Sequence, residues 1–166
     1  MSPGERVLAR EGRPSLGEVY EAERDGLVRF AAFVTGDVGA AAEVVHDAFA
    51  DLQVAWESVQ SPRAWLRSAV AKKSVSWVRR RTVARRYLHA GLRVDRDAQP
   101  SDISDRVAVR QAVARLSPQQ RVVVFARFYL DMSEAQTAAS LGLRHGTVKS
   151  RLSRALRELE GALDER

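Results

Sequence analysis

Three side chains near the C-terminus have the types and the spacing that suit contact with the edges of DNA bases. Thr147, Arg151 and Arg154 follow one another at i, i+4 and i+7, which places them on one face of a helix. An arginine there can donate two parallel hydrogen bonds to guanine in the major groove, whereas flanking cations and hydroxyls meet phosphate oxygens. The predicted DNA-contacting set is Arg144, Thr147, Lys149, Ser150, Arg151 and Arg154.

A helix-turn-helix is the element that would present this face. Ser133 is a candidate N-cap for a helix over Glu134–Leu141, Gly142 interrupts that helix, and a second helix is predicted to begin near Gly146–Thr147. Counted from Glu134, the small residue Ala138 is fifth, where the two helices touch, and Gly142 is ninth, where the turn needs a positive φ. The branched apolar residue Val148 is fifteenth, where the second helix faces the core. The alternative interpretation is an ordinary basic helical hairpin. The stripe predicted to be buried on the second helix is Val148, Leu152, Ala155, Leu156 and Leu159.

Basic residues are concentrated in two zones of the chain. The 166 residues include 27 Lys and Arg against 21 Asp and Glu, which gives a formal net charge of +6. Residues 58–94 hold ten basic residues and no acid, and residues 135–157 hold five and no acid. Such a balance permits nucleic acid or an anionic membrane surface as partner. Four aspartates lie in the polar segment between the zones, which indicates two modules joined by a linker.

Composition also excludes several classes of protein. The chain has no cysteine, which excludes disulfide scaffolds, thiolate metal sites and cysteine catalysis. It lacks the roughly 20 consecutive apolar residues of a membrane span, and its first residues are too polar for a signal peptide, so we expect a cytoplasmic protein without membrane insertion. We find no phosphate-binding loop, metal-ligand cluster or nucleophile–base pair, so the sequence predicts neither an enzyme nor a cofactor or metal.

Every periodic segment predicts a helix. The first is expected from Leu16 to about Thr35, with Ser15 as its N-cap and Gly36 at its end, and Asp37 caps the next. Further helices are expected over 62–88, 103–116 and 118–129, and two more from 134 onward. The predicted fold is all-α, with a three-helix N-terminal bundle and a four-helix C-terminal bundle that contains the helix-turn-helix, joined by a flexible linker.

The C-terminal motifs resemble one known family. Leu116-Ser117-Pro118-Gln119-Gln120-Arg121 precedes Leu141-Gly142-Leu143 and the run from Gly146 to Ala155. Together they closely resemble region 4 of the bacterial extracytoplasmic-function (ECF) sigma factors, the module that binds the −35 promoter element in that family. The sequence departs from the family pattern at Gln136, where an acid is usual, and at Arg144, where a serine commonly caps the recognition helix.

The N-terminal half resembles region 2 of the same family more loosely. Gly36-Asp37, the run from Glu43 to Phe49 and Trp56 are similar to the helix that docks on the clamp helices of the polymerase β′ subunit. The resemblance implies polymerase contacts at Glu43, His46 and Asp47, with His46 at the family's usual glutamine position. Glu43 and Asp47 form an acidic stripe with Asp51 at helical spacing, and a cationic partner would relieve their mutual repulsion.

The segment from Trp65 to Arg81 resembles the regions that open and read the −10 element. Leu66, Val70 and Trp77 are expected to pack inward, and Trp65 could either stack on an extruded base or anchor the core. The resemblance implies −10 contacts at Trp65, Lys72, Lys73, Ser76, Arg79 and Arg80.

These observations predict a two-domain sigma factor. Residues 1–14 would be a disordered tail, 15–90 region 2, 91–105 the linker and 106–166 region 4. The implied partners are core RNA polymerase, through its β′ clamp helices and β flap, and promoter DNA, and an anti-sigma factor is left open as a third. Two other functions remain open from sequence: a stand-alone helix-turn-helix regulator, and a decoy that binds polymerase or an anti-sigma factor.

Overall fold

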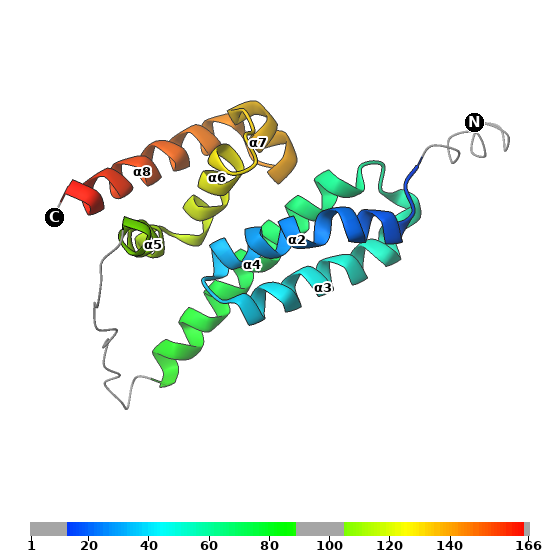
Figure 1. Cartoon of the computed structure of the whole chain (residues 1–166), viewed down its shortest axis with the longest axis horizontal. Helices are drawn as coiled ribbons and strands as arrows, with labels where there is room; N and C mark the ends of the chain where they lie inside the picture. Colours follow the sequence, from blue (N-terminus) through cyan, green and yellow to red (C-terminus); the bar gives the residue numbers. More distant parts are fainter. Residues whose placement is uncertain (1–12, 89–104, 165–166) are drawn as a thin grey trace, which may run out of the picture.

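The computed structural model describes residues 13–88 and 105–164, and all regular structure in these ranges is helical (Figure 1). The N-terminal bundle comprises α2 (Leu16–Thr35), α3 (Val38–Ala55), the short helix η1 (Trp56–Ser58) and α4 (Pro62–Leu88). The C-terminal bundle comprises α5 (Asp105–Arg115), α6 (Pro118–Phe128), α7 (Glu134–Leu141) and α8 (His145–Asp164). The prediction of an all-α fold with three and four helices is confirmed.

The predicted tail and linker lie almost entirely outside the described residues. Within the predicted tail, Arg13 is described. It donates hydrogen bonds of 2.7 Å to the carbonyls of Trp56 and Val59, and its guanidinium lies 4.3 Å from the centroid of the Trp56 ring. Asp105, the last residue of the predicted linker, is the first residue of α5.

The helix ends are set by the caps that the sequence predicts. Ser15 accepts a hydrogen bond from the Glu18 amide and forms a capping box with it, and Asp37 accepts from the Ala40 amide. Gly36 ends α2 in the left-handed region, at φ 71°, which a residue with a Cβ adopts only at a cost. The α2–α3 turn is therefore fixed by adjacent residues.

The core of the N-terminal bundle lies between its three long helices. Phe30 and Val34 of α2, Leu52 of α3, and Leu66 and Val70 of α4 are all buried. Beyond Val78 the side chains of α4 up to position 84 are exposed, and this end of the helix runs past α2 and α3 (Figure 1). The basic end of α4 is thus presented to solvent, as its charge pattern predicts.

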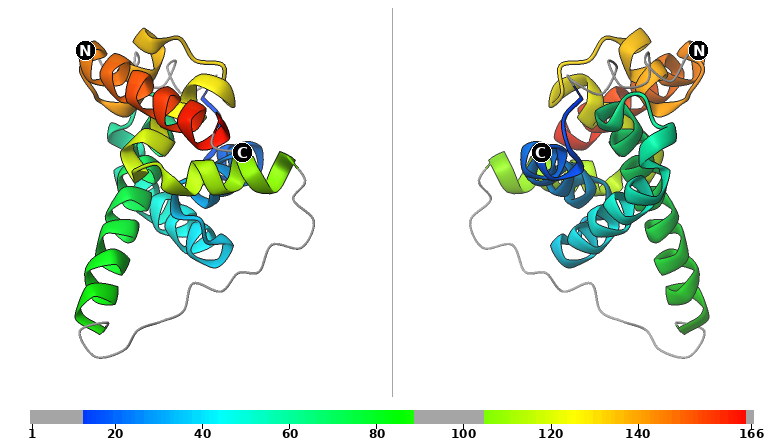
Figure 2. Two further views of the ribbon diagram at one scale, coloured as in Figure 1. Left: turned by 90° about the vertical axis from the view of Figure 1, so that its left-hand side faces the viewer. Right: turned by 90° about the vertical axis from the view of Figure 1, so that its right-hand side faces the viewer.

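The C-terminal bundle is built on α6 and α8. Leu116, Val123 and Val124 are buried with Val148 and Leu152 of α8, and α5 packs against the same helix. The two bundles also contact each other, because α6 packs on α2 and α4, and α7 packs on α4 (Figure 2). In the described residues, no helix is long and apolar enough to cross a membrane.

Candidate nucleic-acid interface

The helix-turn-helix of α7 and α8 is shaped by local interactions. Ser133 accepts a hydrogen bond from the Gln136 amide, and Gln136 accepts one from the Ser133 amide, so this departure from the family pattern completes a capping box. Gly142 makes the turn at φ 64°. The second helix begins at His145, one residue earlier than predicted, and the Arg144 carbonyl accepts hydrogen bonds from the amides of Thr147 and Val148.

The outward face of α8 carries the side chains that the sequence assigns to DNA. Arg144, Lys149, Ser150 and Arg154 are exposed, whereas Thr147 and Arg151 are half-buried. Arg154 donates from Nε to the Ser150 carbonyl at 3.3 Å, and the Ser150 hydroxyl donates to the Thr147 carbonyl at 3.1 Å. The apolar stripe at Val148, Leu152 and Ala155 is buried on the other side. This face is therefore one-sided, basic and open to a ligand.

The α4 side chains implied for the −10 element divide into three groups. Lys72, Ser76, Arg79 and Arg80 are exposed. Lys73 is half-buried and forms an ion pair with Asp51, with Nζ 2.7 Å from Oδ2. Trp65 is half-buried and packs against the hydrophobic core, so the structure gives it an anchoring role.

Comparisons with known proteins cover the same two bundles. Residues 106–159 match the family described as Sigma-70, region 4. The RNA polymerase sigma-E factor of Streptomyces coelicolor is 32% identical over an alignment of 157 positions, which covers 89% of this chain and 89% of the relative. The ECF RNA polymerase sigma factor SigL of Mycobacterium tuberculosis is 32% identical over an alignment of 159 positions, which covers 89% of this chain and 88% of the relative.

The chain belongs to the ECF sigma factors. Two solved structures have the same fold at lower identity. The sigma factor RpoE in complex with the anti-sigma factor NepR from Bartonella quintana has a TM-score of 0.67 and 23% identity, covering 87% of this chain and 94% of that one. CnrH in complex with the cytosolic domain of CnrY has a TM-score of 0.66 and 24% identity, covering 96% and 94%.

A groove between α3 and α4 brings together side chains that the sequence assigns to different partners of the sigma factor. Glu43 and Asp47 of α3, implied for polymerase, line it opposite basic side chains of α4 implied for DNA. Its volume is about 340 Å³. His46 is exposed. The acidic stripe therefore has cations of this chain beside it, which sequence spacing alone does not reveal. The α4 side chains in the groove are Lys72, Lys73, Ser76, Trp77 and Arg80.

A second polar groove, of about 580 Å³, lies between the start of α6 and the outward face of α8. Thr147, Arg151 and Arg154 line it together with Gln119. The Gln120 amide nitrogen donates a 2.7 Å hydrogen bond to the Glu158 carboxylate, which fastens the start of α6 to α8. Gln120 belongs to the sequence motif that resembles region 4, and nothing local to it indicates a partner 38 residues away.

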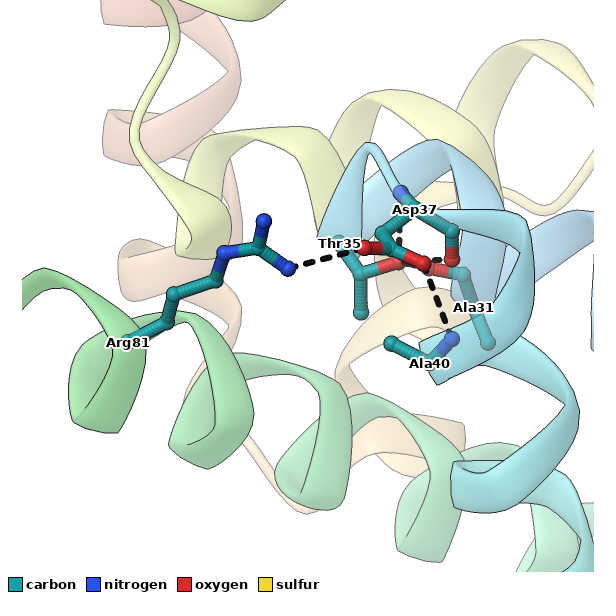
Figure 3. Close-up of polar contacts among 5 residues, drawn as sticks. All are labelled: Ala31, Thr35, Asp37, Ala40 and Arg81. Atoms are coloured by element: carbon teal, nitrogen blue, oxygen red, sulfur yellow. Dashed lines mark hydrogen bonds and ion pairs between the residues drawn. The ribbon is translucent and has the colours of Figure 1, made fainter.

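Asp37 fixes the basic end of α4 to the α2–α3 turn (Figure 3). Its Oδ1 accepts from the Ala40 amide at 3.0 Å, and its Oδ2 accepts from Arg81 Nη1 at 2.8 Å. The Arg81 guanidinium also lies 4.9 Å from the centroid of the Trp77 ring. The Thr35 hydroxyl donates to the Ala31 carbonyl at 2.8 Å and supports the turn. Arg81, which no sequence signal singles out, is therefore held against the α2–α3 turn while its side chain stays exposed.

The Asp37–Arg81 pair predicts a pH-dependent difference in stability. The hydrogen bond from the Ala40 amide, and then the one from Arg81, hold the pKa of Asp37 below its ordinary value of 3.8. Because folding favours the carboxylate, this stabilisation is present above pH 3.8 and is lost as the pH falls through the lowered pKa. Asp37→Asn keeps an oxygen for the Ala40 amide but loses the charge. We expect its melting temperature to be lower than that of the wild type at pH 7, and to approach it below pH 3.8.

Thermal unfolding followed by circular dichroism measures this difference. Arg81→Gln should show the same convergence, and Arg24→Gln, which removes an exposed pair with Asp25, is the matched control. A deficit for Asp37→Asn of equal size at pH 7 and pH 3 would contradict a role for the charge.

Proposed function

We propose that this sigma factor acts by binding alone: α8 reads the −35 element as duplex, α4 captures the −10 element, and the acidic stripe of α3 docks on core RNA polymerase in the cytoplasm. The observation that carries the proposal is the one-sided basic face of α8, which lies within the stretch that matches sigma region 4. Relatives that match 89% of the chain span both bundles, which favours a sigma factor over a stand-alone regulator.

The positions of the basic side chains on α8 support two separate roles, contact with bases and contact with phosphates. Arg151 and Arg154 line the groove between α6 and α8, where a guanidinium can reach the edge of a guanine. Lys149 is exposed on the flank of α8, outside that groove, where a flexible ammonium meets phosphate. Base reading is therefore assigned to the arginines, and positioning on the backbone to the lysine.

The N-terminal bundle supports docking and strand capture on adjacent helices. Lys72, Arg79 and Arg80 give α4 an exposed cationic surface that suits a phosphate backbone. Glu43 and Asp47 on α3 suit a cationic surface of the polymerase, for which we propose the β′ clamp helices, and the β flap would engage the other bundle. One solved neighbour is a sigma factor in complex with an anti-sigma factor, so we propose such a partner for this chain as well.

The roles assigned to α8 predict that one substitution lowers the sequence specificity of DNA binding and another lowers its overall affinity. A bidentate arginine–guanine pair discriminates by about 1–3 kcal/mol, so in the holoenzyme Arg151→Ala should reduce the preference among −35 variants about 5- to 150-fold. Lys149→Ala should weaken all variants alike and reduce the salt slope of binding by about 0.9. The measurement is fluorescence anisotropy of promoter DNA across a salt series. Arg29→Ala, which removes an exposed arginine of α2 outside both proposed DNA surfaces, is the control. An equal loss on every variant for Arg151→Ala would make Arg151 a phosphate contact.

The α3 assignment predicts a loss of polymerase binding without a loss of DNA binding. Glu43→Gln with Asp47→Asn removes both charges while keeping side-chain size, and two exposed charges at an interface contribute about 3- to 10-fold in affinity. We expect weaker binding to immobilised core polymerase and unchanged or tighter binding to single-stranded −10 DNA, since the neighbouring α4 cations are freed.

The matched control changes the same charge elsewhere. Glu21→Gln with Asp25→Asn neutralises two exposed acids at the same spacing on α2 and should leave polymerase binding unchanged. If the α3 variant binds the polymerase as tightly as this control does, the docking surface lies elsewhere.

A further inference from the structure

A cavity of about 250 Å³ between α4 and the C-terminal bundle has an apolar interior. Its buried lining comes from Ala71 of α4, Val122 of α6 and Leu141 of α7. The half-buried side chains of Val75 and Leu143 complete the apolar part of the wall. An apolar cavity of about 150 Å³ is large enough to bind benzene. The larger space here therefore has room for an apolar group of two fused rings.

The polar side chains of the same cavity are more exposed and include two cations. Lys72 is exposed and Arg151 is half-buried, and the exposed side chains of Ser76 and Gln119 lie with them in the lining. Among the described residues, no acid lines this cavity, and neither cation forms an ion pair. The cavity thus combines an apolar interior with a cationic rim.

Two polar grooves described above would not select an anion in this way. The groove between α3 and α4 contains the carboxylates of Glu43 and Asp47, and the groove between the start of α6 and α8 contains that of Glu158. These carboxylates repel an anionic ligand and compete with it for the neighbouring cations. A third groove, which Phe33 and Phe128 line, has no charged side chain in its lining. An apolar wall and unpaired cations occur together in the α4 cavity.

We propose that this cavity binds a small hydrophobic carboxylate, and that the bound carboxylate inhibits promoter binding. The apolar body of the ligand, of about ten carbon atoms, lies against Val122 and Leu141. Its carboxylate accepts hydrogen bonds from Lys72 and from Arg151, whose planar guanidinium suits a carboxylate.

The inhibition follows from the roles of the two cations. It rests on the proposed function, which assigns Lys72 to the −10 element and Arg151 to the −35 element. A carboxylate held by both side chains makes them unavailable to DNA. The ligand therefore regulates the sigma factor by competing with the promoter for these cations.

Calorimetric titration of the free, full-length sigma factor with 2-naphthoate tests the site. We expect a dissociation constant of roughly 0.1–1 mM, which is typical of a ligand of this size. Naphthalene-2-carboxamide has the same rings without the charge, so it should bind at least about 3-fold more weakly. Equal affinity for the two compounds would overturn the inference, as would the absence of detectable binding of 2-naphthoate in this range.

Substitutions in the cavity show where the compound binds. Val75→Phe fills the cavity with a ring and should abolish binding of 2-naphthoate. Val109→Phe makes the same change at an exposed position of α5 outside the cavity, and should leave binding unchanged. Lys72→Gln, at an exposed position, should weaken binding of 2-naphthoate at least about 3-fold and leave that of the carboxamide unchanged. Wild-type affinity of either cavity variant for 2-naphthoate would overturn the inference.

Promoter binding in the presence of core polymerase tests the inhibition. At about ten times its dissociation constant for the free sigma factor, 2-naphthoate should weaken binding of promoter DNA about 10-fold. The Val75→Phe variant should bind the promoter as the wild type does without the compound, and should not respond to it. Promoter binding of the wild type that the compound leaves unchanged would overturn the inference.

The titration needs neither polymerase nor DNA, so it tests the site independently of the proposed function. Failure of the ligand-free sigma factor to bind a promoter with core polymerase would count against the proposed function alone.

Discussion

Phe125 is the side chain on which the arrangement of this sigma factor depends. Its ring is buried between Phe30 and Phe33 of α2 on one side and stacks on Tyr129 on the other, with centroids 4.4 Å apart. Full burial of such a ring contributes about 1.5–3 kcal/mol, and aromatic pairs add to it. Because α8 packs on α6, the position of the Phe125 ring on α2 determines where α8 lies relative to α4. One buried contact thus determines how the two proposed DNA surfaces lie relative to each other.

Charges that could serve partners are partly neutralised within the chain. Lys73 pairs with Asp51, and Arg63 pairs with Glu23 at 2.9 Å. Exposed pairs of this kind contribute little to stability, so a nucleic acid or a polymerase surface can replace them at low cost. The acidic and basic faces of the N-terminal bundle are therefore neighbours whose ion pairs can be exchanged for contacts with a partner.

Capping residues and hydrophobic periodicity predict the helices, but they do not predict the contacts between residues that lie far apart in the sequence. Ser15, Asp37 and Ser133 cap the helices as predicted, because a cap depends on residues two or three positions away. The outward face of α8 is predicted in the same way, from the helical spacing of its apolar and polar residues. The contact of Arg121 with Val34 spans 87 residues, and no local pattern indicates a carbonyl as the partner of an arginine. The pairing of Lys73 with Asp51 was missed for the same reason.

The distance between the bundles tests the central claim most directly. Spin labels at Ala22→Cys on α2 and Glu160→Cys on α8 occupy exposed positions in a chain that has no other cysteine. Electron–electron double resonance should give one narrow distance distribution for the free sigma factor. With core polymerase and promoter DNA, that distribution should lengthen by more than about 30 Å, as elements about 25 base pairs apart require. An unchanged distribution in the promoter complex, or a broad one in the free protein, would contradict the account.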